Sequence, residues 1–85
     1  MNTKTKKQSP EQFWTEHTAK HLVGRKITKV EYIPVEEMED AGWYKRPIAI
    51  QLDNGHWLVP LQDDEGNDGG AMSTTFKNLS TIPVI

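Results

Sequence analysis

The stretch that decides the fold is "PIAIQLDNGHWLVPLQ", residues 47–62. Its first half alternates apolar residues with small or polar ones, which is the period of a half-buried β-strand. Asn54-Gly55 comes next and is the preferred pair for the two-residue type I′ turn of a hairpin. A second apolar run follows the turn, with Trp57, Val59 and Leu61 in alternation. The stretch therefore predicts an antiparallel β-hairpin with Asn54-Gly55 at its tip.

The predicted turn also fixes which residues meet at the far end of the hairpin. Pro47 would pair with Gln62, so Arg46 would lie opposite Asp63. We expect Arg46 to form an ion pair or hydrogen bonds with Asp63 or Asp64. An exposed ion pair contributes only about 0–1 kcal/mol. The second strand is expected to be an edge strand, or to bulge, at its proline, because proline cannot donate to a ladder.

The residues before the hairpin predict one helix, one strand and one helical turn. Ser9 is a good N-cap, Pro10 suits the first helical position, and Gln12 can close a capping box. The helix is expected over residues 10–23 and should end at Gly24 in a left-handed conformation. Residues 26–33 are rich in β-branched side chains and predict a strand. The acidic segment 35–42 suits a short helical turn.

Two further short strands are expected after the hairpin, over residues 71–78 and 79–85. The predicted class is α+β: an N-terminal helix followed by a four- to five-stranded twisted antiparallel meander, forming an SH3-like roll or a small curled sheet. We expect the helix to cover one face or the open end of this sheet. The alternative is a helix that fills a flatter sheet.

Size and composition indicate a single domain with a thin core. The chain has 85 residues, is 35% hydrophobic and contains no cysteine, and its mean hydropathy is -0.68. A disulfide scaffold, a thiolate zinc site and a cysteine nucleophile are excluded. The lack of disulfides favours a reducing cytoplasm. No apolar run suits a signal peptide or a membrane span, so no membrane association is expected.

Charge is distributed unevenly along the chain. Residues 1–30 hold seven of the ten Lys and Arg and only two of the twelve acids. Residues 1–8 are expected to form a disordered basic arm, and residues 9–85 the single domain. The lysines of the arm, Lys4, Lys6 and Lys7, suit either phosphate contacts or a solubilising tail. The acids elsewhere argue against a nucleic-acid partner, because binding phosphate requires a positive surface.

The segment "LQDDEGNDGGA", residues 61–71, combines oxygen-bearing side chains with glycines. Carboxylate and amide oxygens are the ligands that calcium prefers. The match to an EF-hand is poor, because counting from Asp63 places Thr74 where that loop needs glutamate. A looser cation site would use four acids: Asp63, Asp64, Glu65 and Asp68. The alternative is a solvated connection, since Asp, Asn and Gly are also the residues that tight turns require.

Two further groups of residues suggest binding chemistry. In "GWYKRP", residues 42–47, Trp43 and Tyr44 lie beside Arg46 and could stack on a ligand, or they could pack in the core with a cation–π contact. His17 and His21 are four residues apart on one helical face, which is half of a zinc site that His56 or a carboxylate would complete. The alternative places both imidazoles at the rim of the core, beside Phe13 and Trp14.

Residues 42–71, "GWYKRPIAIQLDNGHWLVPLQDDEGNDGGA", resemble a group of small bacterial proteins of unknown function. In those proteins a GWY-x-RP segment is followed by a hairpin and a glycine-rich DDEGN loop. The likeness covers about residues 24–76 and departs at Asp68, where a small residue is expected. The resemblance implies a shared fold. It brings no activity, cofactor or catalytic residue.

Three hypotheses for function follow. The first is a small non-catalytic binding or protein-interaction module that contacts a protein partner or a second copy of the chain. Its surface would be built from Trp43, Tyr44, Arg46, Asp63, Asp64, Glu65 and Asn67. The second is a module that binds a divalent cation at the acidic loop. The third is an enzyme of unknown class with the loop as its active site. No cofactor is expected under the first hypothesis.

Overall fold

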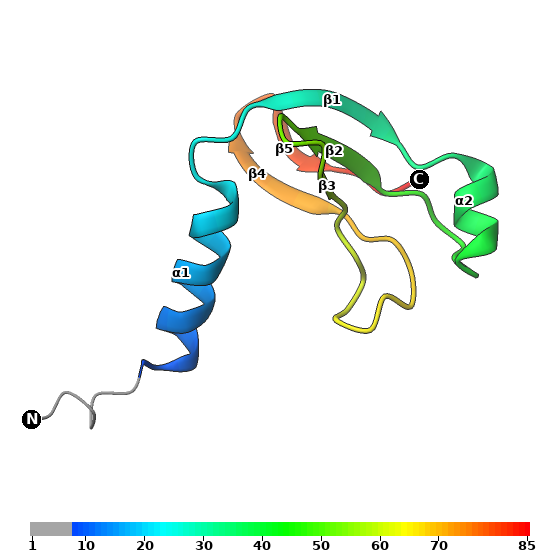
Figure 1. Cartoon of the computed structure of the whole chain (residues 1–85). Coiled ribbons are helices and arrows are strands. Elements are labelled where there is room, and N and C mark those ends of the chain that lie inside the picture. Colours follow the sequence, from blue (N-terminus) through cyan, green and yellow to red (C-terminus); the bar gives the residue numbers. More distant parts are fainter. Residues whose placement is uncertain (1–7) are drawn as a thin grey trace, which may run out of the picture.

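A computed structural model describes residues 8–85 and shows an α+β fold. A helix, α1 (Pro10–Leu22), leads into a three-stranded and a two-stranded antiparallel sheet, with a short helix, α2 (Val35–Asp40), between the first two strands (Figure 1). The predicted basic arm falls almost entirely on residues 1–7, outside the described residues. Within the described part, no helix is long and apolar enough to cross a membrane.

Helix α1 begins and ends where the sequence predicts. The Ser9 side chain accepts a hydrogen bond from the Gln12 N–H at 3.1 Å, and the Gln12 side chain accepts one from the Ser9 N–H at 3.2 Å. This reciprocal pair is the capping box. Gly24 follows the helix with φ +84°, the left-handed conformation that glycine adopts without steric cost. The prediction is confirmed, with the last helical residue at Leu22.

The three-stranded sheet has the order β1 (Ile27–Tyr32), β2 (Ile48–Leu52) and β3 (Trp57–Leu58). Strands β1 and β2 pair from Lys29 opposite Gln51 to Tyr32 opposite Ile48, with an irregularity between Ile27 and Lys29. Helix α2 (Val35–Asp40) forms the predicted acidic turn between these strands. Strand β3 is the expected edge strand and ends before Pro60, which has no N–H to continue the ladder.

The turn of the hairpin differs from the prediction by one residue. The Leu52 N–H donates to the His56 carbonyl at 2.8 Å, and the Gly55 N–H donates to the Leu52 carbonyl at 2.9 Å. The loop therefore contains three residues, with only Gly55 at positive φ, +88°. A three-residue loop of this kind combines a type I turn with a left-handed residue. The register shifts accordingly, and Gln51 pairs with Trp57 instead of Leu58.

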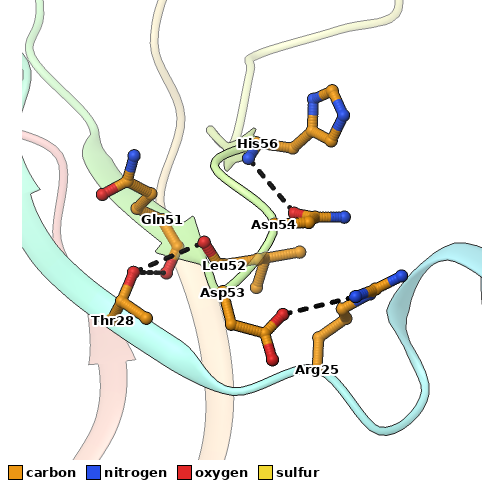
Figure 2. Close-up of polar contacts among 7 residues, drawn as sticks. All are labelled: Arg25, Thr28, Gln51, Leu52, Asp53, Asn54 and His56. Carbon is orange, nitrogen blue, oxygen red and sulfur yellow. Dashed lines mark hydrogen bonds and ion pairs between the residues drawn. The ribbon is translucent and has the colours of Figure 1, made fainter.

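Side chains around this turn explain why the three-residue loop is stable (Figure 2). The Asn54 carboxamide oxygen accepts a hydrogen bond from the His56 N–H at 3.2 Å, which closes a side-chain turn over residues 54–56. Asn54 keeps a negative φ in this turn. Across the strands, Arg25 pairs with Asp53 at 3.5 Å. The Thr28 hydroxyl donates to the backbone carbonyls of β2 at the position where the register of β1 is irregular.

The remaining strands, β4 (Met72–Phe76) and β5 (Leu79–Ile82), form a separate two-stranded sheet. The expectation of one continuous meander is therefore wrong, although the antiparallel pairing of neighbours in sequence is confirmed. Strand β3 is only two residues long and offers too little edge for β4 to join. The chain end returns to the first sheet, where the Tyr32 hydroxyl donates to the Pro83 carbonyl at 2.8 Å and Ile85 exchanges backbone hydrogen bonds with Arg46.

The core is small and centres on β2. Ile48, Ala49 and Leu52 are each at most 6% exposed, and Pro47 just before the strand is fully buried. Burying a large aliphatic side chain stabilises the fold by about 1.5–3 kcal/mol. Because so few side chains are buried, β2 carries a large share of the stabilisation.

Helix α1 does not cover the sheet, contrary to expectation. It has no buried residue and extends away from the strands (Figure 1). Phe13 and Trp14 are 45% and 61% exposed, and Phe13 stacks on His17 with ring centroids 5.5 Å apart. His17 is therefore away from the core, whereas His21, at the C-terminal end of α1, lines a groove with Leu52. The apolar face of the helix is narrow and partly occupied by histidine, so docking it would bury little apolar surface.

We expect Leu52→Ala to lower the free energy of unfolding by about 2–5 kcal/mol, because it opens a cavity in a small core. Trp14→Ala should leave the unfolding midpoint of the sheet almost unchanged, because α1 buries no residue. Urea denaturation followed by circular dichroism measures both. Equal losses of unfolding free energy in Leu52→Ala and Trp14→Ala would contradict the conclusion that the core at β2, and not α1, stabilises the fold.

Candidate functional site

The carboxylate of Asp68 joins the acidic loop to the segment that precedes β2. Asp68 is 9% exposed. Its Oδ1 accepts hydrogen bonds from the backbone N–H groups of Tyr44 at 3.1 Å, Lys45 at 3.0 Å and Gly69 at 2.8 Å. One side chain therefore fixes two stretches of backbone that are more than twenty residues apart in sequence.

The same contacts determine the ionisation of Asp68. Burial disfavours the charged form, but the N–H donors of Gly69, Lys45 and Tyr44, together with the charge of Lys45, outweigh it and lower the pKa of the carboxyl. The aspartate is therefore held as a carboxylate. This is the opposite of the raised pKa that a general acid needs.

Close packing of Gly69 completes this junction between the acidic loop and residues 44–47. A Cβ atom built on Gly69 would lie 2.5 Å from Cδ of Pro47 and 3.1 Å from the Lys45 carbonyl oxygen. Gly69 also forms an isolated bridge with Leu61, and the indole N–H of Trp43 donates to the Gly66 carbonyl at 2.8 Å. The loop is thus held against residues 43–47 at several points.

The outer part of the loop is organised by Asp63. Its Oδ1 accepts from the backbone N–H groups of Glu65 at 3.1 Å and Asn67 at 3.2 Å, and its Oδ2 accepts from the Asn67 side-chain amide at 2.9 Å. The Asn67 side-chain hydrogen bond, followed by the backbone N–H donors of Asn67, Glu65 and Gly66, lowers the pKa of Asp63. Gly66 turns the chain with φ +72°.

These contacts create one composite surface, which we call the Tyr44 platform: residues 43–46 together with loop residues 63–68. Hydrogen bonds to Gly66 and Asp68 join the segment of Trp43 and Tyr44 to the acidic loop. Tyr44 is 87% exposed although its backbone N–H is fixed by Asp68. In the loop, Asp64 and Glu65 are exposed, whereas Trp43, next to Tyr44 in sequence, is half-buried.

The contact predicted for Arg46 is wrong. Within residues 8–85 the two ion pairs are Arg25–Asp53 and Lys29–Glu31, and neither includes Arg46. The backbone of Arg46 instead pairs with Ile85. The one-residue change in the hairpin register removes Arg46 from its place opposite Asp63, since such a slip reverses which side chains share a face. Asp68, and not Arg46, joins the loop to the segment before β2, and it does so through backbone N–H groups.

The structure does not gather a set of metal ligands in the described residues. There, no group of three His, Cys, Asp or Glu side chains could hold a metal ion. Asp63 and Asp68 direct oxygens at N–H donors, which favours the loop's own structure over a cation. His21 and His56 do line one small groove of about 200 Å³, but the other residues that line it are Leu22, Leu52, Asn54 and Leu58.

A groove of about 320 Å³ shares no residue with the Tyr44 platform. It lies between the three-stranded sheet and α2, and two acids, Glu31 and Glu37, line it beside Trp57. Its remaining lining is apolar and consists of Ile33, Pro34, Ala49 and Val59.

Comparisons with models of known families, with curated proteins and with solved structures found no match to this chain. The structural roles of Asp68 and Gly69 were missed from the sequence. In the sequence, Asp68-Gly69 indicates only a local turn, because Asp and Gly are turn residues, and it carries no sign of the donors at Tyr44 and Lys45.

Gly69→Ala should lower the free energy of unfolding by about 1–3 kcal/mol, because the added methyl group overlaps the ring of Pro47. Replacing that ring should relieve the overlap. The cost of Gly69→Ala should therefore be smaller in a Pro47→Ala background, and a double-mutant cycle by urea denaturation measures the difference. Strictly additive losses would disprove the contact.

Acidification should weaken the junction through Asp68. Because the pKa of Asp68 is lower in the folded state than in the unfolded state, the folded state binds fewer protons. The contribution of Asp68 to the free energy of unfolding is therefore complete above the ordinary pKa of 3.8, and it is lost as the pH falls through the lowered pKa of the folded state. Asp68→Asn should reduce the melting temperature at neutral pH and flatten its decline between about pH 5 and about pH 2. Asp64→Asn, at an exposed position of the same loop, is the matched control and should behave as wild type.

Proposed function

We propose that the protein is a small non-catalytic binding module and that the Tyr44 platform contacts a protein partner. The observation that carries the proposal is a tyrosine that is 87% exposed on a backbone fixed by a buried carboxylate. Tyrosine is enriched at protein interfaces because its ring supplies apolar area and its hydroxyl a hydrogen bond.

The fixed backbone supports binding for an energetic reason. Association costs free energy when loops and side chains must be ordered, and a surface that is already ordered avoids part of this cost. Asp63 accepts from the backbone N–H groups of Glu65 and Asn67, and Asp68 from that of Gly69, so the loop is ordered by its own hydrogen bonds.

Charge indicates the chemistry of the partner. Asp64 and Glu65 are exposed at the rim of the platform, and Asp63 carries a lowered pKa that keeps it ionised. Lys45 is also exposed on the platform, so a partner surface with both signs of charge around an apolar pocket for Tyr44 would match this arrangement. Such charge complementarity mainly raises the rate of association and makes it sensitive to salt.

Tyr44→Ala tests the proposal. We expect the variant to keep the wild-type melting temperature, because the side chain is exposed, and to lose at least about tenfold in affinity, as an interface tyrosine does. Immobilised wild-type protein would be used to capture partners from the source cell, and calorimetry with the purified partner would measure the dissociation constant.

Phe76→Ala is the matched control, because Phe76 is also a largely exposed aromatic residue (70%) and belongs to the other sheet. A partner that depends on the platform is lost by Tyr44→Ala and retained by Phe76→Ala. A partner that Tyr44→Ala binds with wild-type affinity would refute the role of the platform.

A further inference from the structure

Strand β1 is an edge of the three-stranded sheet, and its outer side is open. Five of its six residues pair on one side with β2, and within residues 8–85 the sheet order places no strand on the other. Figure 1 shows β1 as the outermost strand of this sheet. Its first five residues are all exposed, and Ile27 and Val30 are 60% and 56% exposed. A long exposed edge of this kind is a template for another strand.

The register shows which backbone groups point outward. The Ile33 N–H donates to the Pro47 carbonyl, so Ile33 and Pro47 form a hydrogen-bonded pair. Such pairs alternate along an antiparallel ladder. Glu31 therefore bonds to β2, while the N–H and C=O groups of Val30 and Tyr32 face away from it. Within residues 8–85 these outward groups of Val30 and Tyr32 have no backbone partner.

The charges on β1 are arranged symmetrically about Val30. Lys29 and Glu31 flank it, lie on the same face of the strand and form an ion pair at 3.5 Å. A second β1 laid antiparallel and centred on Val30 would place Lys29 of each copy opposite Glu31 of the other. Residues directly opposite in such a pair have Cβ atoms about 4.5–5.5 Å apart, and opposite charges there are stabilising.

We propose that two copies of this chain associate through their β1 edges, antiparallel and centred on Val30, to form one continuous six-stranded sheet. The outward N–H and C=O groups of the two Val30 residues bond to each other. Two Lys29–Glu31 contacts form across the interface, and the exposed valines lie side by side. A parallel arrangement in the same register would place like charges opposite and is disfavoured. The β1 edge shares no residue with the Tyr44 platform, so this inference stands independently of the proposed function.

The charge pattern allows a direct test by sedimentation equilibrium. Lys29→Glu alone places Glu opposite Glu at both contacts, and Glu31→Lys alone places Lys opposite Lys. Each single variant should dimerise at least about tenfold more weakly than wild type, because two attractive contacts become repulsive. The double variant Lys29→Glu/Glu31→Lys restores opposite charges and should dimerise within about threefold of wild type.

Mixing the two single variants gives the most specific readout. A chain with two glutamates is complementary to a chain with two lysines, so the mixture should form heterodimers although neither variant self-associates well. A wild-type chain that stays monomeric at high concentration would overturn the proposal. So would single variants that dimerise as wild type does, or a mixture that gives no heterodimer.

Val30→Pro tests pairing through the β1 edge without removing a hydrogen bond between β1 and β2. It removes an N–H group that the proposed pairing uses and that β2 does not, and proline is tolerated on edge strands. We expect the circular dichroism spectrum to be retained and dimerisation to be lost. A folded Val30→Pro variant that dimerises with wild-type affinity would exclude pairing through β1. If the variant does not fold, the charge exchanges decide the question alone.

Discussion

The carboxylate of Asp68 is the interaction on which the arrangement of the two halves of the chain depends. It is nearly buried, and burial of an uncompensated charge is costly. The cost is offset by three backbone N–H donors from Tyr44, Lys45 and Gly69. Since these groups come from the segment before β2 and from the loop after β3, one side chain sets the position of both. The sheet supplies little that could replace it, because the buried apolar core is confined to a few residues of and beside β2.

Glycine and proline act with this carboxylate. Gly69 has no room for a side chain against Pro47, and Gly70 has none against the Leu61 backbone. Pro47 is fully buried and leads directly into β2. Close backbone packing thus links the hydrogen-bonded junction to the hydrophobic core. This link explains how a loop rich in acids and glycines can be part of the structure.

Local signals in the sequence predicted the local structure well. Ser9, Gln12 and Gly24 predicted both ends of α1, and Gly42 the end of the acidic turn at α2, because caps depend on nearby residues alone. The alternation around Asn54-Gly55 predicted the hairpin but not its register, which depends on whether Asn54 adopts a left-handed conformation. For the site, the sequence predicted that residues 43–46 and the acidic loop meet, but through Arg46 and Asp63, whereas the contact is made by Asp68. The junction at Asp68 could not be predicted, because its donors are backbone N–H groups that every residue type carries.

The other edge of the three-stranded sheet has a consequence for any assembly of this chain. Strand β3 spans two residues, and Pro60 follows it closely, so further strands find few groups to bond on that side. A pair joined through β1 uses the one long edge of this sheet and leaves the two-residue β3 strands at its margins. Addition of a third molecule through β1 is therefore blocked, and this route of association ends at a closed twofold particle.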